Sequence, residues 1–330
     1  MDRIKVQTIQ VGRTMNQIEV APLQADLPFG ARIRGVSFAT LEDAAVRKRI
    51  QAVFEQRGMI VFEDVEPSSK MQVLISEVFG PLKDHPVKMV ERVDQQAMPG
   101  VITIRTDPKA CIVEINGEQL MNWQPWHFDH SYNNELNRAG VLRADTIAAK
   151  GGMTGFADGA QIYRDMDPVL RAKAEKLNVI YTLDLHYERQ FFGLPKTFRE
   201  IQPKGAQLLE FAKTLPRAIH PAVWTRRTGE KIVHLSPYGS RGIEGMETPE
   251  GKALIAEIWE EVERTLKPYY HQWKATDMLI WDNWRMLHMA CGCDPKCDRV
   301  MHRTTIKGDY GLGRWETAPT AGARSTVEMA

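Results

Sequence analysis

Apolar and polar residues follow a helical period in two stretches near the start of the chain. The first spans residues 41 to 58, LEDAAVRKRIQAVFEQRG, and closes with Gly58, a residue type favoured at helix C-termini. The apolar run MIVFED, 59 to 64, follows it and is interpreted as a short strand. A second amphipathic helix is predicted over residues 68 to 80, SSKMQVLISEVFG, which starts with Ser and ends with Gly. The N-terminal part is therefore predicted to mix helix and strand.

From about residue 100 the pattern changes to short strand-like runs separated by Gly, Pro and Asn. The runs are VITIRT, CIVEIN, VLRADTIAA, LNVIYTLDL, KIVHL, ATDMLIWDN and VMHRTTIKGDY. Helical patterns interrupt them at 166 to 177 and at 248 to 267, the second beginning with Thr-Pro. We therefore predict a mainly β fold with flanking helices, of the sandwich or barrel type. No repeat or internal boundary is evident, so residues 1–330 are predicted to form a single domain with a mobile tail over 316–330.

Composition and net charge limit the classes of binding partner that we expect for this protein. The 330 residues are 43% hydrophobic, enough for a large core, and 43 Lys+Arg against 42 Asp+Glu give a net charge of +1. This balance gives no electrostatic reason to expect nucleic acid or an anionic membrane as partner, so we expect a small-molecule ligand. No apolar run approaches the ~20 residues of a membrane span, and the start lacks the features of a secretory signal. A soluble, cytoplasmic protein is expected.

The segment PWHFDHSY, residues 125 to 132, concentrates candidate metal ligands. On a strand, His127 and Asp129 would face one side, while Phe128 and His130 would face the other. His288, after a later strand-like run, is the candidate third ligand. Two histidines and one carboxylate on one face of a metal are the arrangement of non-haem Fe(II) oxygenases. From this motif alone, a His-rich strand with ordinary hydrogen bonds remains the alternative.

Four elements in order resemble one known family. They are W-H-x-D, G-G-x-T, W-D-N followed by a histidine, and a pair of late arginines. In this chain they stand as Trp126, His127 and Asp129; Gly151, Gly152 and Thr154; Trp281, Asp282, Asn283 and His288; and Arg299 and Arg303. Together they resemble the taurine and phenoxyacetate family of Fe(II)/2-oxoglutarate-dependent dioxygenases, over roughly residues 18 to 312.

The resemblance implies a fold and an iron site. The fold would be a double-stranded β-helix, the cupin-like jelly roll, with N-terminal α/β elements and inserted helices. His127, Asp129 and His288 would bind Fe(II), and Thr154 and Arg299 would bind the distal carboxylate of 2-oxoglutarate. A planar guanidinium suits a carboxylate because it can donate two parallel hydrogen bonds. Without the rest of the set, Arg299 could equally form a surface ion pair.

The resemblance also implies substrate contacts. Arg303 would hold a carboxylate, sulfonate or similar anion of the substrate; the alternative is a second structural arginine that braces the cosubstrate pocket. His85 and Trp123 would lie near the substrate, and Trp126 and Tyr132 are further candidates for the pocket wall or for plain core. Lys88 and Met153 depart from the family's pattern, which leaves the particular substrate open.

The implied reaction is hydroxylation of an aliphatic C–H bond, with O2 as second cosubstrate and release of succinate and CO2. Where the hydroxylated carbon carries a heteroatom, C–O, C–N or C–S cleavage would follow. Because Asp129 keeps a carboxylate, hydroxylation is favoured over halogenation. Two alternatives remain: a zinc hydrolase with the same three ligands, and a non-catalytic barrel that binds a small acid. A homo-oligomer is also expected.

Three of the four cysteines crowd into CGCDPKC. Such crowding does not resemble the spaced framework of a secreted disulfide protein, so a reducing compartment is indicated. Cys291, Cys293 and Cys297 could bind a soft metal, with Cys111 as the fourth thiolate, but the spacing is not that of a zinc finger or ribbon. Free thiols in an ordinary loop are the favoured interpretation.

Overall fold

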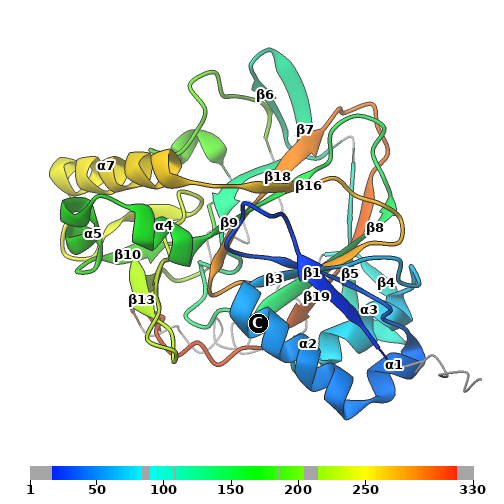
Figure 1. Ribbon diagram of the computed structural model, residues 1–330. Helices are drawn as coiled ribbons and strands as arrows, with labels where there is room; N and C mark the ends of the chain where they lie inside the picture. Colours follow the sequence, from blue (N-terminus) through cyan, green and yellow to red (C-terminus); the bar gives the residue numbers. More distant parts are fainter. Residues whose placement is uncertain are drawn as a thin grey trace, which may run out of the picture.

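The fold is that of a computed structural model, which describes residues 17–83, 90–94, 96–107, 109–184, 186–203 and 215–317. Within these ranges the chain forms two large β-sheets, a smaller four-stranded sheet and two groups of helices (Figure 1). No helix in the described part of the chain is both long and apolar enough to cross a membrane.

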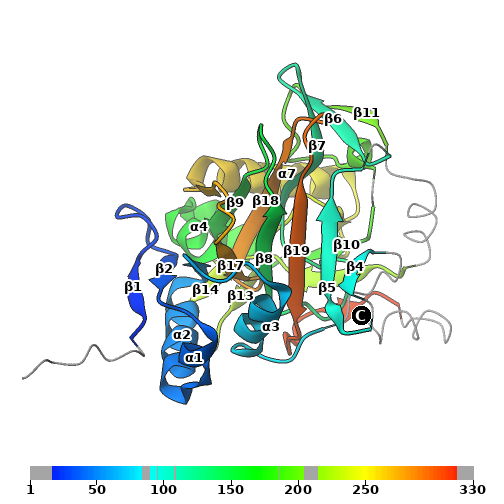
Figure 2. The ribbon, with the colours of Figure 1, turned by 90° about the vertical axis from the view of Figure 1, so that its right-hand side faces the viewer.

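The larger sheet has eight strands and is antiparallel except where β2 pairs with β3 in parallel. In spatial order its strands are β1 (Glu19–Pro22), β2 (Ala31–Arg34), β3 (Met59–Phe62), β17 (Met278–Asp282), β8 (Ala139–Thr146), β19 (Val300–Ile306), β5 (Met98–Arg105) and β4 (Arg92–Asp94). Figure 2 shows β19 between β8 and β5.

The second sheet has six strands. In spatial order they are β11 (Arg199–Gln202), β6 (Ile112–Ile115), β7 (Glu118–His127), β18 (Met286–Cys293), β9 (Thr154–Asp158) and β16 (Tyr269–His271). All of its pairings are antiparallel.

Strand alternation explains how the two sheets share a core. Leu279 and Trp281 of β17 pack with Phe156 and Met286 of the six-stranded sheet, so these side chains fill the space between the eight-stranded and six-stranded sheets. Met278 and Ile280, one position out of phase, face the opposite side. The two facing sheets form the double-stranded β-helix, so the predicted jelly-roll core is confirmed.

The N-terminal helices cover the outer side of the larger sheet (Figure 1). They are α1 (Phe38–Glu42), α2 (Ala44–Arg57) and α3 (Ser69–Glu77). The cap positions fit the sequence: Gly58 closes α2 with a φ of 76°, and the Ser68 side chain accepts a hydrogen bond from the Met71 backbone N–H at the start of α3. The predicted helix–strand–helix order of this region is confirmed.

A third layer packs on the outer face of the six-stranded sheet, where Ala157 and Leu287 contact it. Its sheet consists of β15 (Ser240–Ile243), β10 (Asn178–Tyr181), β12 (Ala218–Pro221) and β20 (Arg314–Trp315). A hairpin joins β13 (Val223–Thr225) to β14 (Lys231–Val233). The helices are α4 (Gly159–Asp165), α5 (Pro168–Ala174), α7 (Pro249–Thr265) and the short 3₁₀ helix η1 (Tyr187–Arg189), and α4, α5 and α7 lie together at one side of Figure 1.

Several sequence predictions need correction. The helix predicted over 166 to 177 is shorter, and α4 precedes it without having been predicted, since seven residues give too few turns for a clear period. Glu316, at the start of the predicted mobile tail, donates its backbone N–H to Arg217 O at 2.9 Å, and the mobile tail itself stays a prediction. Residues 318–330 lie outside the described ranges. The single-domain assignment stays a prediction.

Candidate active site

Two of the predicted metal ligands face each other across one strand pair. His127 is the last residue of β7, and its Cα partner on the antiparallel strand β18 is His288. Directly opposite residues of an antiparallel pair project to the same face. The two imidazole rings accordingly lie 4.1 Å apart between centroids, and both side chains are buried.

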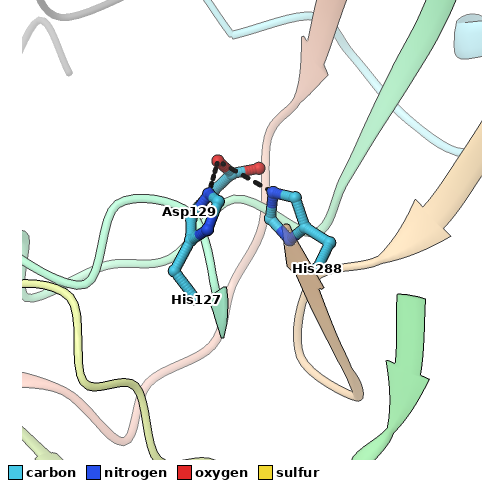
Figure 3. A group of neighbouring side chains, drawn as sticks. All are labelled: His127, Asp129 and His288. Carbon is cyan, nitrogen blue, oxygen red and sulfur yellow. Dashed lines mark ion pairs between the residues drawn. The ribbon is translucent and has the colours of Figure 1, made fainter. Parts of the chain in front are cut away.

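The third ligand reaches the same place by a different route from the one predicted. Because β7 ends at His127, Asp129 lies in a turn, and the prediction that strand alternation pairs it with His127 is wrong. The turn nevertheless directs its carboxylate back, so that Oδ1 lies 3.5 Å from His288 Nε2 and 3.9 Å from His127 Nε2 (Figure 3). One ligand atom from each residue fits within a group spanning 4.8 Å, and no other such group occurs in the described part of the chain.

Hydrogen bonding and burial prepare His127 to bind a metal. Its Nδ1 lies 2.7 Å from the carbonyl oxygen of Pro125, which assigns the proton to Nδ1 and leaves the lone pair of Nε2 facing the triad. Burial, reinforced by the neighbouring His288, lowers the pKa of His127 to about 3. The ring is therefore neutral near pH 7, the form that coordinates metals.

Arg303 contacts the carboxylate of the triad. Its guanidinium donates to Asp129 Oδ1 at 3.1 Å and also to Oδ2. Burial by itself would raise the pKa of Asp129, but Arg303, His288 and His127 together hold it well below its usual value. Asp129 is therefore ionised and oriented. Arg303 thus pairs with Asp129 and also lines the cavity, and its predicted role in holding a substrate anion stays a prediction.

The triad opens onto a cavity of about 350 Å³ between the two sheets. Its lining combines apolar walls with a few polar groups, as is typical of small-molecule sites. The lining residues that bear on function are His127, His288, Arg303, Arg299, Thr154 and Trp123. They come from three separate parts of the chain, 123–127, 154 and 288–303, which the sheet order brings together.

Arg299 is a buried cation without an acid partner. Its side chain donates to the carbonyl oxygen of Gly152 at 3.3 Å, and no carboxylate of the described residues lies within ion-pair distance. Burial accordingly lowers its pKa. Thr154, the first residue of β9, lines the same cavity, and its Oγ1 accepts a hydrogen bond from Trp273 Nε1 at 3.2 Å. A buried, unpaired guanidinium is costly unless a ligand supplies the anion.

The glycine pair before Thr154 is required by this geometry. Gly151 and Gly152 adopt φ values of 80° and 81°, in the left-handed region. A Cβ on Gly152 would lie 3.2 Å from Arg299 Nε, and one on Gly151 would lie 2.8 Å from the backbone oxygen of Gly292. The G-G-x-T element therefore lets a tight turn pass beside the buried arginine.

Of the other candidate residues, some line the cavity and some do not. Trp123 lines the cavity, as predicted, whereas neither Trp126 nor Tyr132 is among its lining residues. His130, predicted not to be a ligand, stays outside the metal group and is buried at a φ of 58°. His85 and Lys88 lie outside the described residues, so the substrate role of His85 stays a prediction.

The prediction that the three clustered cysteines lie in a loop is wrong. Cys291 and Cys293 belong to β18, and only Cys297 lies beyond it. Cys291, Cys293 and Cys297 form no disulfide, and none of the four cysteines belongs to the metal-binding group of the described part. Burial raises the pKa of the Cys291 thiol to about 11, which makes it a poor metal ligand and nucleophile near neutral pH.

Three polar lining residues were missed from the sequence: Asn122, Gln124 and Tyr187. Asn122 has a φ of 56°, and with this kink three consecutive residues of β7, Asn122 to Gln124, line the cavity. No local sequence pattern predicts a left-handed backbone conformation inside a strand, apart from the tolerance of Asn for that conformation. Tyr187 braces the wall, because its hydroxyl donates to the backbone oxygen of Trp123 at 2.9 Å.

Together, the jelly roll and a buried His-Asp-His group near an arginine without an acid partner among the described residues are the features expected of a metal-dependent protein that binds a small acid. Comparison with known proteins identifies the family. Residues 19–305 match the family described as "Taurine catabolism dioxygenase TauD, TfdA family", and the chain belongs to it. It is an Fe(II)- and 2-oxoglutarate-dependent dioxygenase, with O2 as the second cosubstrate. Family membership decides against the zinc hydrolase and the non-catalytic barrel.

Individual relatives are distant but match along most of their length. A (S)-phenoxypropionate/alpha-ketoglutarate-dioxygenase of Sphingobium herbicidovorans is 27% identical over 88% of this chain and 95% of its own. An alpha-ketoglutarate-dependent sulfate ester dioxygenase of Pseudomonas putida is 26% identical over 90% and 92%. The crystal structure of a taurine dioxygenase from Burkholderia xenovorans superposes with a TM-score of 0.68 at 24% identity, over 95% of this chain and 99% of that one. This last likeness establishes the fold.

The residues fit the family's cofactors. Two imidazole nitrogens and one carboxylate oxygen that all lie within 4.8 Å of one another form a donor set suited to Fe(II). The unpaired Arg299 at the cavity wall offers the cationic partner that a carboxylate of 2-oxoglutarate requires.

Metal binding predicts a measurable gain in stability. Mn(II), a redox-stable substitute for Fe(II), should stabilise the protein against unfolding by about 2.7 kcal/mol at a hundred times its Kd. His127→Ala and His288→Ala should abolish this gain. His130→Asn, at a neighbouring histidine whose left-handed backbone Asn tolerates, is the matched control and should keep it. Thermal unfolding with and without Mn(II) is the measurement, and an unchanged gain in His127→Ala would contradict the assignment.

Proposed function

We propose that the enzyme hydroxylates an aliphatic C–H bond of a small, anionic organic substrate, with His127, Asp129 and His288 as the iron ligands. The balance is one O2, one 2-oxoglutarate and one substrate C–H in, and one succinate, one CO2 and one substrate C–OH out. Where the hydroxylated carbon bears O, N or S, collapse of the product breaks that bond.

One observation supports the proposal: the two histidines of the triad, His127 and His288, line the same cavity as Arg299, which has no acid partner among the described residues. A metal site alone would fit hydrolysis as well, and an arginine alone would fit simple binding. Their combination fits a reaction in which a dicarboxylic keto acid reaches the metal with one end while the other end needs a cation. Thr154 lies beside that cation as a second hydrogen-bonding group.

The protein's own contribution is positioning and exclusion of water. Bound Fe(II) supplies the oxidising chemistry with O2 and 2-oxoglutarate. Arg299 and Thr154 orient 2-oxoglutarate through its distal carboxylate. Trp123, Trp281 and Leu142 wall the cavity with apolar surface, which keeps a reactive oxidant from side reactions.

The anionic nature of the substrate rests on Arg303 and on the relatives. Arg303 lines the same cavity as Arg299 and contacts the triad through its bonds to Asp129. Relatives at 26 and 27% identity are named for a sulfate ester and for phenoxypropionate, both of which are anions. A substrate anion bound to Arg303 would share the positive charge of the guanidinium with Asp129. Because Asp129 belongs to the triad, the reacting carbon would lie close to the metal.

The reaction is tested by succinate formation. With Fe(II), O2 and 2-oxoglutarate, the wild type should release succinate in amounts matched to the substrate consumed. His127→Ala should reduce the rate of release at least a hundredfold, because the metal loses one of three protein ligands. The His130→Asn variant serves again as control. Succinate release that is unchanged in His127→Ala would exclude this iron site.

The anion is tested separately with a matched pair of compounds. Phenoxyacetate should couple to succinate formation, whereas phenoxyacetamide, nearly the same shape without the charge, should couple less well. The expected loss in kcat/KM is roughly tenfold to a hundredfold, the value of a hydrogen bond to a charged group. The same comparison can be made with an alkyl sulfonate and an alkyl sulfate against uncharged analogues. Equal coupling by charged and neutral members would contradict the anionic substrate and leave the dioxygenase reaction standing.

A further inference from the structure

The W-D-N element contains no predicted metal ligand, yet Trp281 and Asn283 contact residues of the triad. Trp281 and Asp282 are the last residues of β17, and Asn283 follows in the turn. All three side chains are buried, and Asn283 has no exposed surface. The buried amide therefore needs partners of its own.

The Asn283 side-chain amide forms hydrogen bonds with the backbone of Asp129. The Asp129 backbone N–H donates to Asn283 Oδ1 at 2.7 Å, and Asn283 Nδ2 donates back to the Asp129 carbonyl oxygen at 3.1 Å. The direction of both bonds fixes which amide atom is oxygen and which is nitrogen. One side chain thus satisfies both backbone groups of a residue that lies beyond the end of its strand.

The position of Asn283 is itself secured. Its backbone N–H donates to the carbonyl oxygen of Arg138 at 3.0 Å, and Nδ2 also reaches both oxygens of Asn137, at 3.1 and 3.2 Å. The preceding residue, Asp282, is 1% exposed and forms ion pairs with Arg138 and Arg226. Buried ion pairs of this kind fix geometry even where they add little net stability.

Trp281 extends the same support to the other ligands. Its ring lies 4.8 Å from the ring of His288, and the Arg303 guanidinium lies over it at 5.3 Å. Gly140 leaves room for this packing, since a Cβ there would lie 2.8 Å from the Trp281 ring. Trp281 thus contacts His288 and Arg303, and Asn283 contacts Asp129, the residue with which Arg303 pairs.

We propose that Asn283 is a positioning residue that fixes the Asp129 carboxylate for metal binding. The inference rests on the proposed iron ligands. A carboxylate in a turn has two χ angles and a backbone without ladder hydrogen bonds, so its direction depends on what holds the peptide. Asn283 holds it from both sides, and loss of this hold reduces metal affinity more than it reduces stability.

The test compares two variants that each remove a buried side-chain amide. Asn283→Ala removes both bonds to Asp129. Gln161→Ala removes a buried amide on α4 that donates to the carbonyl oxygen of Thr265 at 2.9 Å and is hydrogen-bonded to neither Asp129 nor Asn283. Both variants should lower the melting temperature of the protein. Only Asn283→Ala should weaken Mn(II) binding, measured by equilibrium titration, and the loss should be about 10- to 100-fold, as for other groups that orient metal ligands. Gln161→Ala should stay within about twofold of the wild type.

Equal losses of Mn(II) affinity in the two variants, or none in either, would overturn the proposal. Should Asn283→Ala not fold, Asn283→Asp takes its place, since it keeps the acceptor for the Asp129 N–H and loses the donor to the Asp129 carbonyl. A folded Asn283→Asp with wild-type Mn(II) affinity would likewise overturn it. These outcomes are separate from failure of the iron site, which would show as absence of Mn(II) binding in the wild type.

Discussion

The register between β7 and β18 is the constraint on which the active site depends. It sets His127 opposite His288, so that two proposed iron ligands 161 positions apart in the sequence meet as nearest cross-strand neighbours. Because side chains alternate along a strand, a shift by one residue would turn either imidazole to the wrong face of the sheet. The register is irregular immediately beside this pair, between His288 and Ala290, where β7 accommodates an extra residue. The irregularity falls where β7 ends and the turn that carries Asp129 begins.

Charge organises the cavity around that pair. Arg303 and Asp129 neutralise each other beside the metal position, whereas Arg299 stays without an acid partner among the described residues. Arg299 is therefore available to the carboxylate of a cosubstrate, whereas a substrate anion at Arg303 would share that guanidinium with Asp129. Two arginines four positions apart thus play different parts because one faces a carboxylate of the chain and the other does not. This difference is visible only in three dimensions.

The sequence predicted the residue types of the site better than their geometry. The jelly roll, the cap residues Gly58 and Ser68, and the meeting of His127, Asp129 and His288 follow from local patterns and from the family resemblance. Strand alternation gave the wrong reason for Asp129, since no local signal marks the end of β7 at His127. The pairing of Arg303 with Asp129 and the hold of Asn283 join positions more than 150 residues apart, and no sequence period reports such contacts. Asn122 escaped notice because a left-handed residue inside a strand has no pattern.

The central claim is that one cavity holds Fe(II) at the triad and the distal carboxylate of 2-oxoglutarate at Arg299. The most direct test is an anaerobic titration of the Fe(II)-loaded protein with 2-oxoglutarate, followed by the charge-transfer absorption of the iron complex. The wild type should saturate with one equivalent. Arg299→Gln should bind Fe(II) normally and need roughly a hundredfold more 2-oxoglutarate, because a charge-assisted carboxylate contact is lost. An unchanged titration in Arg299→Gln, or no absorption band in the wild type, would contradict the account.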